Sequence, residues 1–221
     1  MKTETVAIQP IQINRVPVRI VGDSSLIMHA WSDKAKQMML DAQMGKAKGK
    51  AKPKKSPASD FIDSMYWLSG KPDVPAGADE EAKMEAVAAA IESGNARFGF
   101  PVTAFKQAAI SAAYRMGWSK DKVSLRGAFF IEADPDGMIE IHSDPPIMRE
   151  DMVKIGMGTA DLRYRGEFRN WSADMIVSYN VNGQYDLESI INIINAGGYI
   201  CGVGEWRPEK DGSFGQFHVA V

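Results

Sequence analysis

Two amphipathic helical patterns, at residues 101–116 and 186–195, constrain the fold of this chain more than any other feature. The first places six apolar residues on one helical face: Val102, Phe105, Ala109, Ala112, Ala113 and Met116. Pro101 suits its first turn, and Gly117 follows its end. The second turns four apolar residues inward: Leu187, Ile190, Ile191 and Ile194. Because a helix with one apolar face must bury that face, we expect these helices to pack on a sheet.

Segments in which apolar residues alternate predict the strands of that sheet. They lie at residues 15–21, 123–131, 139–141, 173–179 and 216–221. The turn sequence Asp134-Pro-Asp-Gly137 predicts a hairpin between the second and third of them. With the insertions removed, the order is strand, helix, strand, strand, helix, strand. This order indicates an α+β protein with a ferredoxin-like or RNA-recognition core, in one domain of residues 1–221.

Several stretches are expected to be inserted into this core. Ser32 can cap a short amphipathic helix that ends near Gly45. Residues 44–59 mix Gly, Ala, Lys and Pro, cannot form a core, and are expected to be a flexible basic arm. The other expected insertions are a strand at 60–68, a surface helix at 78–92 and a long loop rich in Arg and aromatic residues at 145–171.

The composition excludes several classes of protein. One cysteine, Cys201, permits neither an intramolecular disulfide nor a cysteine-rich metal site. His29, His142 and His218 are isolated in the sequence, so no metal or other cofactor is expected. The chain lacks a run of about 18 apolar residues and a secretory signal pattern. We therefore expect a cytoplasmic protein without a membrane partner.

The formal net charge of −2 conceals a local concentration of cations. Between Ala42 and Ser59 the chain has six lysines and no acid. The lysines are Lys46, Lys48, Lys50, Lys52, Lys54 and Lys55. Such an arm can neutralise phosphates and release counterions without reading a base sequence. The alternative is a solvated linker that has no partner.

The loop at 145–171 interleaves cations with aromatic side chains, as single-strand binders require. The cations are Arg149, Lys154, Arg163, Arg165 and Arg169, and the aromatic residues are Tyr164, Phe168 and Trp171. In the alternative, intramolecular ion pairs occupy the arginines, with Glu150, Asp151, Asp161 and Glu167 as the partners.

A glycine-rich stretch at 197–217 precedes the last expected strand and contains the sequence Gly202-Val-Gly-Glu-Trp-Arg-Pro. Glycine N–H groups can receive phosphates, Arg207 offers a planar fork, and Trp206 offers a stacking surface. The alternative is a glycine-closed helix end and a tight turn, with Trp206 in the core. No Gly-Lys-Ser/Thr sequence ends the stretch, so it is not a P-loop.

A glycine-rich loop before the final strand of such a fold resembles that of the RAMP superfamily, the RNA-binding backbone proteins of CRISPR effector complexes. The stretch is also similar to the ends of a group of small phage proteins, and a phage origin would imply the cytoplasm of a bacterial host. The resemblance implies a core that carries RNA on its surface, an inserted finger that contacts the next subunit, and copies aligned along a strand. His29 follows the first strand, where RAMP-type RNA endonucleases carry a general base, and Lys34 or Tyr114 is a possible assistant.

The sequence therefore predicts a non-enzymatic protein that binds single-stranded RNA or DNA through its backbone and assembles head to tail. The residues expected to contact the strand are the six arm lysines, Arg126, Arg163, Arg165, Arg169, Trp171, Gly202, Gly204, Trp206 and Arg207. Two alternatives remain. One is a metal-independent RNA endonuclease that uses His29, although the sequence offers His29 only Asp33 as a neighbour. The other is a protein inhibitor or scaffold that acts on a host complex.

Overall fold

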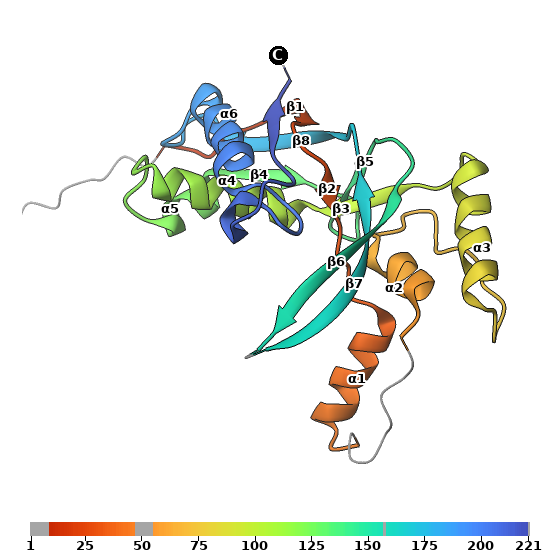
Figure 1. The fold of residues 1–221 in the computed structure, drawn as a ribbon. Coiled ribbons are helices and arrows are strands. Elements are labelled where there is room, and N and C mark those ends of the chain that lie inside the picture. The colour runs from red at the N-terminus through yellow and green to blue at the C-terminus, as the bar shows by residue number, and fades with distance from the viewer. Residues whose placement is uncertain (1–8, 47–54, 157, 221) are drawn as a thin grey trace, which may run out of the picture.

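The computed structural model describes residues 9–46, 55–156 and 158–220, and shows a mixed α+β protein with antiparallel sheets. The largest sheet has the strand order β4-β8-β1-β9. Its strands are β1 (Ile13–Gly22), β4 (Phe129–Glu132), β8 (Ser172–Asn180) and β9 (Phe217–Val219), and each neighbouring pair is antiparallel. Helices α4 (Val102–Arg115) and α6 (Leu187–Ala196) pack side by side on one face of this sheet (Figure 1). Both predicted amphipathic helices are confirmed.

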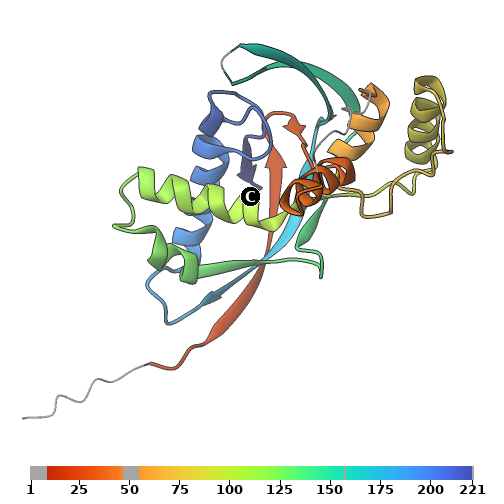
Figure 2. The same cartoon turned by 90° about the horizontal axis from the view of Figure 1, so that it is seen from below.

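Smaller elements extend this core. A three-stranded sheet has the order β2-β7-β6, and a two-stranded sheet pairs β3 with β5. The strands are β2 (Leu26–Ile27), β3 (Phe98–Pro101), β5 (Met138–Ile141), β6 (Ile147–Ile155) and β7 (Thr159–Phe168). The remaining helices are α1 (Asp33–Gln43), α2 (Pro57–Ser64), α3 (Glu80–Glu92) and α5 (Lys122–Ala128). Helix α1 and the β6/β7 hairpin project from the same side of the core (Figures 1 and 2).

Three aromatic side chains hold α4 against the large sheet. Phe105 of α4 lies 6.3 Å from Trp171 and 5.5 Å from Phe217, measured between ring centroids. All three are at most 1% exposed. The indole N–H of Trp171 donates to the Ser24 carbonyl at 2.8 Å, so the one polar atom of this ring is satisfied in the core. Gly22 makes room for this ring, because a Cβ there would lie 2.1 Å from the indole nitrogen.

The expectation of a long irregular loop at 145–171 is wrong. Residues 147–168 form the antiparallel hairpin of β6 and β7. The sequence conceals these strands because charged residues occupy their inward positions. Asp151, Arg165 and Glu167 are each less than 8% exposed. Apolar side chains usually fill such positions in a strand, so their absence made the sequence look like a loop.

Two further expectations are wrong. Residues 60–68 were expected to be a strand, but α2 covers most of this segment and begins with Pro57 after the capping hydroxyl of Ser56. The strand expected at 123–131 is α5 followed by β4, because Asp121 caps the helix at the Ser124 N–H. The turn before Gly137 does form, with its N–H 3.0 Å from the Asp134 carbonyl. It does not join a hairpin, since β4 pairs with β8 and β5 pairs with β3.

Within the part of the chain that the structure describes, every helix is too short or too polar to cross a membrane. The segment from 47 to 54, which holds four of the six lysines of the expected basic arm, lies outside the described residues.

Replacing Phe105 with Ala should lower the free energy of unfolding by about 3–5 kcal/mol, because it removes a ring that contacts both Trp171 and Phe217. Urea unfolding followed by circular dichroism measures this change. Phe130→Ala is the matched control, since this ring is 54% exposed and should cost much less. Equal destabilisation by the two variants would contradict the role given to Phe105.

Candidate nucleic-acid interface

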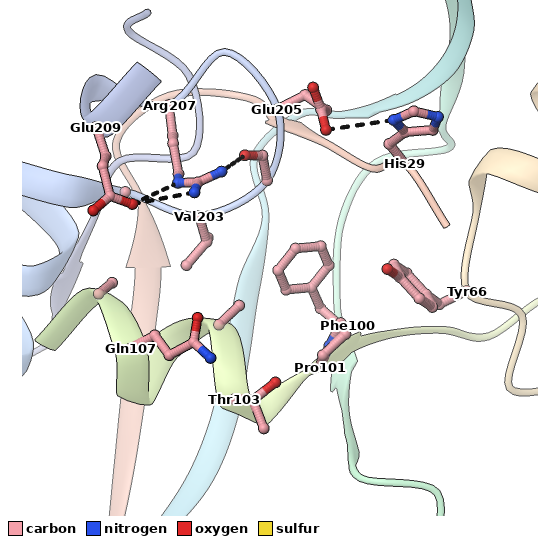
Figure 3. Close-up of a pocket in the computed structure, with 14 residues that line it drawn as sticks. His29, Tyr66, Phe100, Pro101, Thr103, Gln107, Val203, Glu205, Arg207 and Glu209 are labelled. Carbon is pink, nitrogen blue, oxygen red and sulfur yellow. Dashed lines mark hydrogen bonds and ion pairs between the residues drawn. The ribbon is translucent and has the colours of Figure 1, made fainter. Parts of the chain in front are cut away.

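A cavity of about 260 Å³ lies where the glycine-rich loop passes over the N-terminus of α4 (Figure 3). The loop contributes Gly202, Gly204 and Arg207, and α4 contributes Thr103 and Gln107. His29 and Tyr66 lie on the other side, His29 following β2 and Tyr66 following α2. The cavity therefore joins polar side chains from segments that are far apart in the sequence.

The loop glycines serve close packing. Gly202 and Gly204 have φ values of 64° and 79°, which disfavour other residues. A Cβ on Gly204 would also lie 2.5 Å from the Ile27 carbonyl. The loop is fixed to β2 by the Glu205 N–H, which donates to the same carbonyl at 3.0 Å. Both glycines line the cavity, yet this packing alone explains why they are glycines.

Arg207 and Trp206 have different environments. The Arg207 guanidinium donates to the Gly204 carbonyl at 3.0 Å and to the Glu209 carboxylate at 3.1 and 3.2 Å (Figure 3). A phosphate at Arg207 must therefore compete with Glu209. Trp206 is 36% exposed and not in the core. The alternative interpretation of this loop, in which Trp206 is a core residue, is therefore wrong on that point.

His29 has a partner that the sequence did not reveal. Its Nδ1 lies 3.4 Å from a carboxylate oxygen of Glu205, a residue of the glycine-rich loop 176 positions later (Figure 3). Arg165 lies 3.5 Å from the other oxygen of Glu205. The hydrogen bond with His29 is the largest cause that lowers the pKa of Glu205, and Arg165 lowers it further. The Glu205 carboxylate therefore stabilises the fold above its unfolded-state pKa, and this contribution is lost as the pH falls through its lowered value.

A second cavity, of about 640 Å³, lies between α1, α2 and β7. Its lining includes exposed Trp31 and Lys34 at the start of α1, Lys55 before α2, and Arg163 and Tyr164 on β7. His29 lines this cavity as well as the first. The two cavities therefore adjoin at His29, and we call them together the trough.

Acidic partners occupy most cations of the trough. Lys55 and Arg163 both contact Asp161, each at 2.6 Å, and buried Arg165 contacts Asp151 at 3.2 Å. Lys34 has no ion pair within the described residues. The other arginines of the hairpin are also paired, Arg149 with Asp151 and Glu167 and Arg169 with Glu167. The geometry thus matches the alternative in which acids of the hairpin tie its arginines.

The structure brings together part of the predicted set. Arg163, Arg165, Gly202, Gly204, Arg207 and Lys55 line the trough. Lys46 is exposed just after α1, while Lys48, Lys50, Lys52 and Lys54 lie outside the described residues. Arg126 lies on α5, and Arg169 is exposed beyond β7. The prediction that Trp171 contacts the strand is wrong. Its side chain is 1% exposed and belongs to the core, so it offers no stacking face to a ligand.

Sequence reasoning missed several lining residues, among them Trp31, Tyr66, Thr103, Gln107 and Glu205. Trp31 and Glu205 carried a weak signal, because one follows His29 closely and the other belongs to the glycine-rich stretch. Tyr114, expected as an assistant of His29, lies in the last turn of α4, at the opposite end from the trough. Lys34 does lie beside the trough with His29.

Among the described residues, no group of three or more His, Cys, Asp or Glu side chains is arranged to hold a metal ion. No protein-family model matches the chain, and no curated protein matches it. Among solved structures, it is similar to the crystal structure of Cmr6 from Pyrococcus furiosus, with 11% sequence identity and a TM-score of 0.35. That alignment covers 96% of this chain and 100% of the other.

Replacing His29 with Ala should raise the pKa of Glu205 toward its usual value, because the main cause of its lowering is removed. Carboxyl carbon shifts, followed by NMR across a pH titration, report this pKa. His218→Ala is the control, since His218 pairs with Asp23 at a different place. An unchanged Glu205 titration in the His29 variant would show that the two side chains do not interact in solution.

Proposed function

We propose that this protein binds single-stranded nucleic acid, RNA or DNA, mainly through backbone phosphates and without catalysis. The observation that carries the proposal is the position of the two described lysines of the lysine-rich segment relative to the trough. Lys55, its last lysine, lines the trough, and Lys46, its first, follows α1, which borders the same cavity. The sequence between these two residues holds four more lysines and no acid, and exposed Trp31 lines the same cavity as Lys55. Cations beside aromatic planes fit a flexible polyanion with stacking bases.

The charge distribution decides which residues carry the affinity in this proposal. Because acids pair with Lys55, Arg163, Arg165 and Arg207, phosphates gain little from those side chains alone. The segment from Lys46 to Lys55 supplies the excess positive charge. Contacts of this kind do not distinguish bases, so the part of the affinity that these lysines supply should vary little with sequence.

The strand order of the large sheet supports our interpretation of the core as ferredoxin-like, the fold class of RNA-recognition domains. With the intervening elements left out, the four strands of that sheet and the two helices that cover it come in the chain order β1, α4, β4, β8, α6 and β9. This is the strand, helix, strand, strand, helix, strand order of that class. We propose on the same ground a RAMP-like protein.

We further propose that copies assemble head to tail along the strand. Helix α1 leads into the lysine-rich segment and has no buried residue, while Met38, Met39, Leu40 and Met44 are each at least 45% exposed. A helix that leaves such side chains in water gains by contact with a neighbour. The next copy on the strand is the neighbour that the lysine-rich segment would bring closest. A contact between unlike surfaces then continues into a filament or closes into a ring.

Replacing the six lysines from Lys46 to Lys55 with Ser should weaken binding to all single strands alike. The slope of log affinity against log salt should become shallower by up to about 4, since each lost phosphate contact removes about 0.7. Fluorescence anisotropy with labelled RNA and DNA strands at several salt concentrations measures both effects. Replacement of the same lysines with Arg is the control and should preserve the slope.

An unchanged affinity and slope in the Ser variant would exclude the lysine-rich segment from the interface. A wild-type protein that binds no strand at low salt would overturn the proposed function and favour the inhibitor or scaffold alternative. Mass photometry of the same samples on a long strand counts the bound copies, and isolated single copies at saturation would contradict assembly.

The contact between His29 and Glu205 favours one second candidate, a metal-independent RNA endonuclease. A carboxylate beside the imidazole can orient it as a general base toward a 2′-hydroxyl, and the sequence alone offered no such partner.

Under the main proposal, incubation of structured RNA with the wild-type protein in chelator should leave the RNA intact. Gel electrophoresis of end-labelled RNA is the measurement. Specific cleavage that disappears in both His29→Ala and Glu205→Gln, and persists in His142→Ala, would establish the endonuclease instead.

A further inference from the structure

The end of α4 opposite the trough carries another cavity, of about 260 Å³, between the ends of α4 and α6. Trp118 lies on one side of it, and Tyr185, Ser189 and Asn192 lie on the α6 side, with Ile193 among the lining residues. Ile193 is 3% exposed, whereas Trp118 is 46% exposed. Gly117, with a φ of 72°, turns the chain after α4, and the Trp118 N–H donates to the Ala113 carbonyl at 3.0 Å. These contacts fix the backbone of Trp118 at the edge of the cavity, which we call the slot.

The surface beside the slot carries both lysines and carboxylates. Lys106, Lys120, Lys122 and Arg126 form no ion pair within the described residues. The nearest acids in sequence, Asp121 and Asp186, cap helices α5 and α6 by accepting hydrogen bonds from backbone N–H groups at 2.7 and 2.9 Å. These carboxylates keep their charge and are held in place by the helix ends, whereas the carboxylates of the trough pair with cations.

Two aromatic rings near the slot are already covered by cations, but Trp118 is not. Lys106 lies 3.9 Å from the ring centroid of Phe130, and Lys122 lies 5.2 Å from that of Tyr114. Among the described residues no cation lies over the Trp118 ring. Trp118 therefore leaves an aromatic face open to a planar ligand, beside Tyr185 on the other side of the slot.

Asn192 gives the slot a polar group that can recognise the edge of such a ligand. Its side-chain amide carries both a donor and an acceptor and has no hydrogen-bond partner within the described residues. A nucleobase presents a donor and an acceptor along one edge and two flat faces, so it matches an aromatic slot with one amide. Glu188, one turn earlier on α6, is exposed, so phosphates should lie on the other side, near Lys120 and Lys122.

From this arrangement we infer that the slot between Trp118 and Tyr185 holds one base of a bound single strand while Lys120 and Lys122 contact its phosphates. The inference rests on the proposed function and adds a site that contacts a base, at the end of α4 that the trough does not reach. The trough and its lysines then hold the backbone, and the slot stacks a base, which gives the interface two points of contact.

The test compares Trp118→Ala with wild-type protein in anisotropy titrations against a labelled homopolymer strand and against an equally long strand that lacks bases. Trp118→Ala should weaken binding to the normal strand about 5- to 150-fold, the range for one stacked base. It should have little effect on the strand without bases. Trp118→Phe should recover much of the loss, and Asn192→Ala should change the preference among homopolymers.

Tyr199→Ala is the matched control, because this ring is 73% exposed and lies outside both the slot and the trough. Thermal unfolding verifies that each variant is folded. If wild-type protein binds the strand and Trp118→Ala binds equally well, the inference is overturned while the proposed function stands. Equal losses on strands with and without bases would also overturn it. If wild-type protein binds neither strand but binds an acidic peptide through Trp118, both proposals fail.

Discussion

The contact of Phe105 with Trp171 and Phe217 is the interaction on which the rest of the structure depends. It joins α4 to the start of β8, an inner strand of the large sheet, and to β9, an edge strand, so that segments about 110 residues apart share one core. Burial of three large rings supplies several kcal/mol, and each ring removed leaves a cavity that its neighbours fill only in part. The position of α4 in turn determines where the trough lies, because the glycine-rich loop passes over its first turn.

A second, polar layer stands between that core and the β6/β7 hairpin. Arg165 and Asp151 are nearly buried, and Arg165 also approaches Glu205 of the glycine-rich loop. Burial of charges is costly unless they are paired, and the Nε of Arg165 lacks a partner within the described residues. Such a network adds little net stability compared with apolar packing. It does favour one orientation of the hairpin relative to the loop, since Arg165 contacts both Asp151 of the hairpin and Glu205 of the loop.

The sequence was informative where burial follows a regular period, and misleading where polar groups replace apolar ones. The helices at 101–116 and 186–195 were predictable because apolar side chains recur along one face. The β6/β7 hairpin was not, because its inward side chains are charged and their pairing is visible only after folding. Val123 and Leu125 look like alternating strand residues, yet the cap at Asp121 starts a helix there.

The same distinction applies to the candidate site. The glycine-rich stretch and the hairpin arginines could be named from the sequence, because unusual composition marks them. The partner of His29 could not, since Glu205 is 176 residues away and only the turn of the loop over β2 brings it near. Trp171 was taken for a ligand contact because it follows a basic segment. Its burial depends on the space that Gly22 leaves for the indole ring. A contact between residues so far apart in the chain cannot be recognised from the sequence around Trp171.

Helix α4 has a consequence beyond packing, because it is the rigid spacer between the trough and the slot. Its 14 residues rise about 1.5 Å each, which separates the two ends by about 21 Å. A strand that occupies both places must cover at least this length, so α4 sets a minimum footprint for each copy of the protein. One helical turn inserted into α4 would lengthen that footprint by about 5.4 Å without altering any residue of the slot.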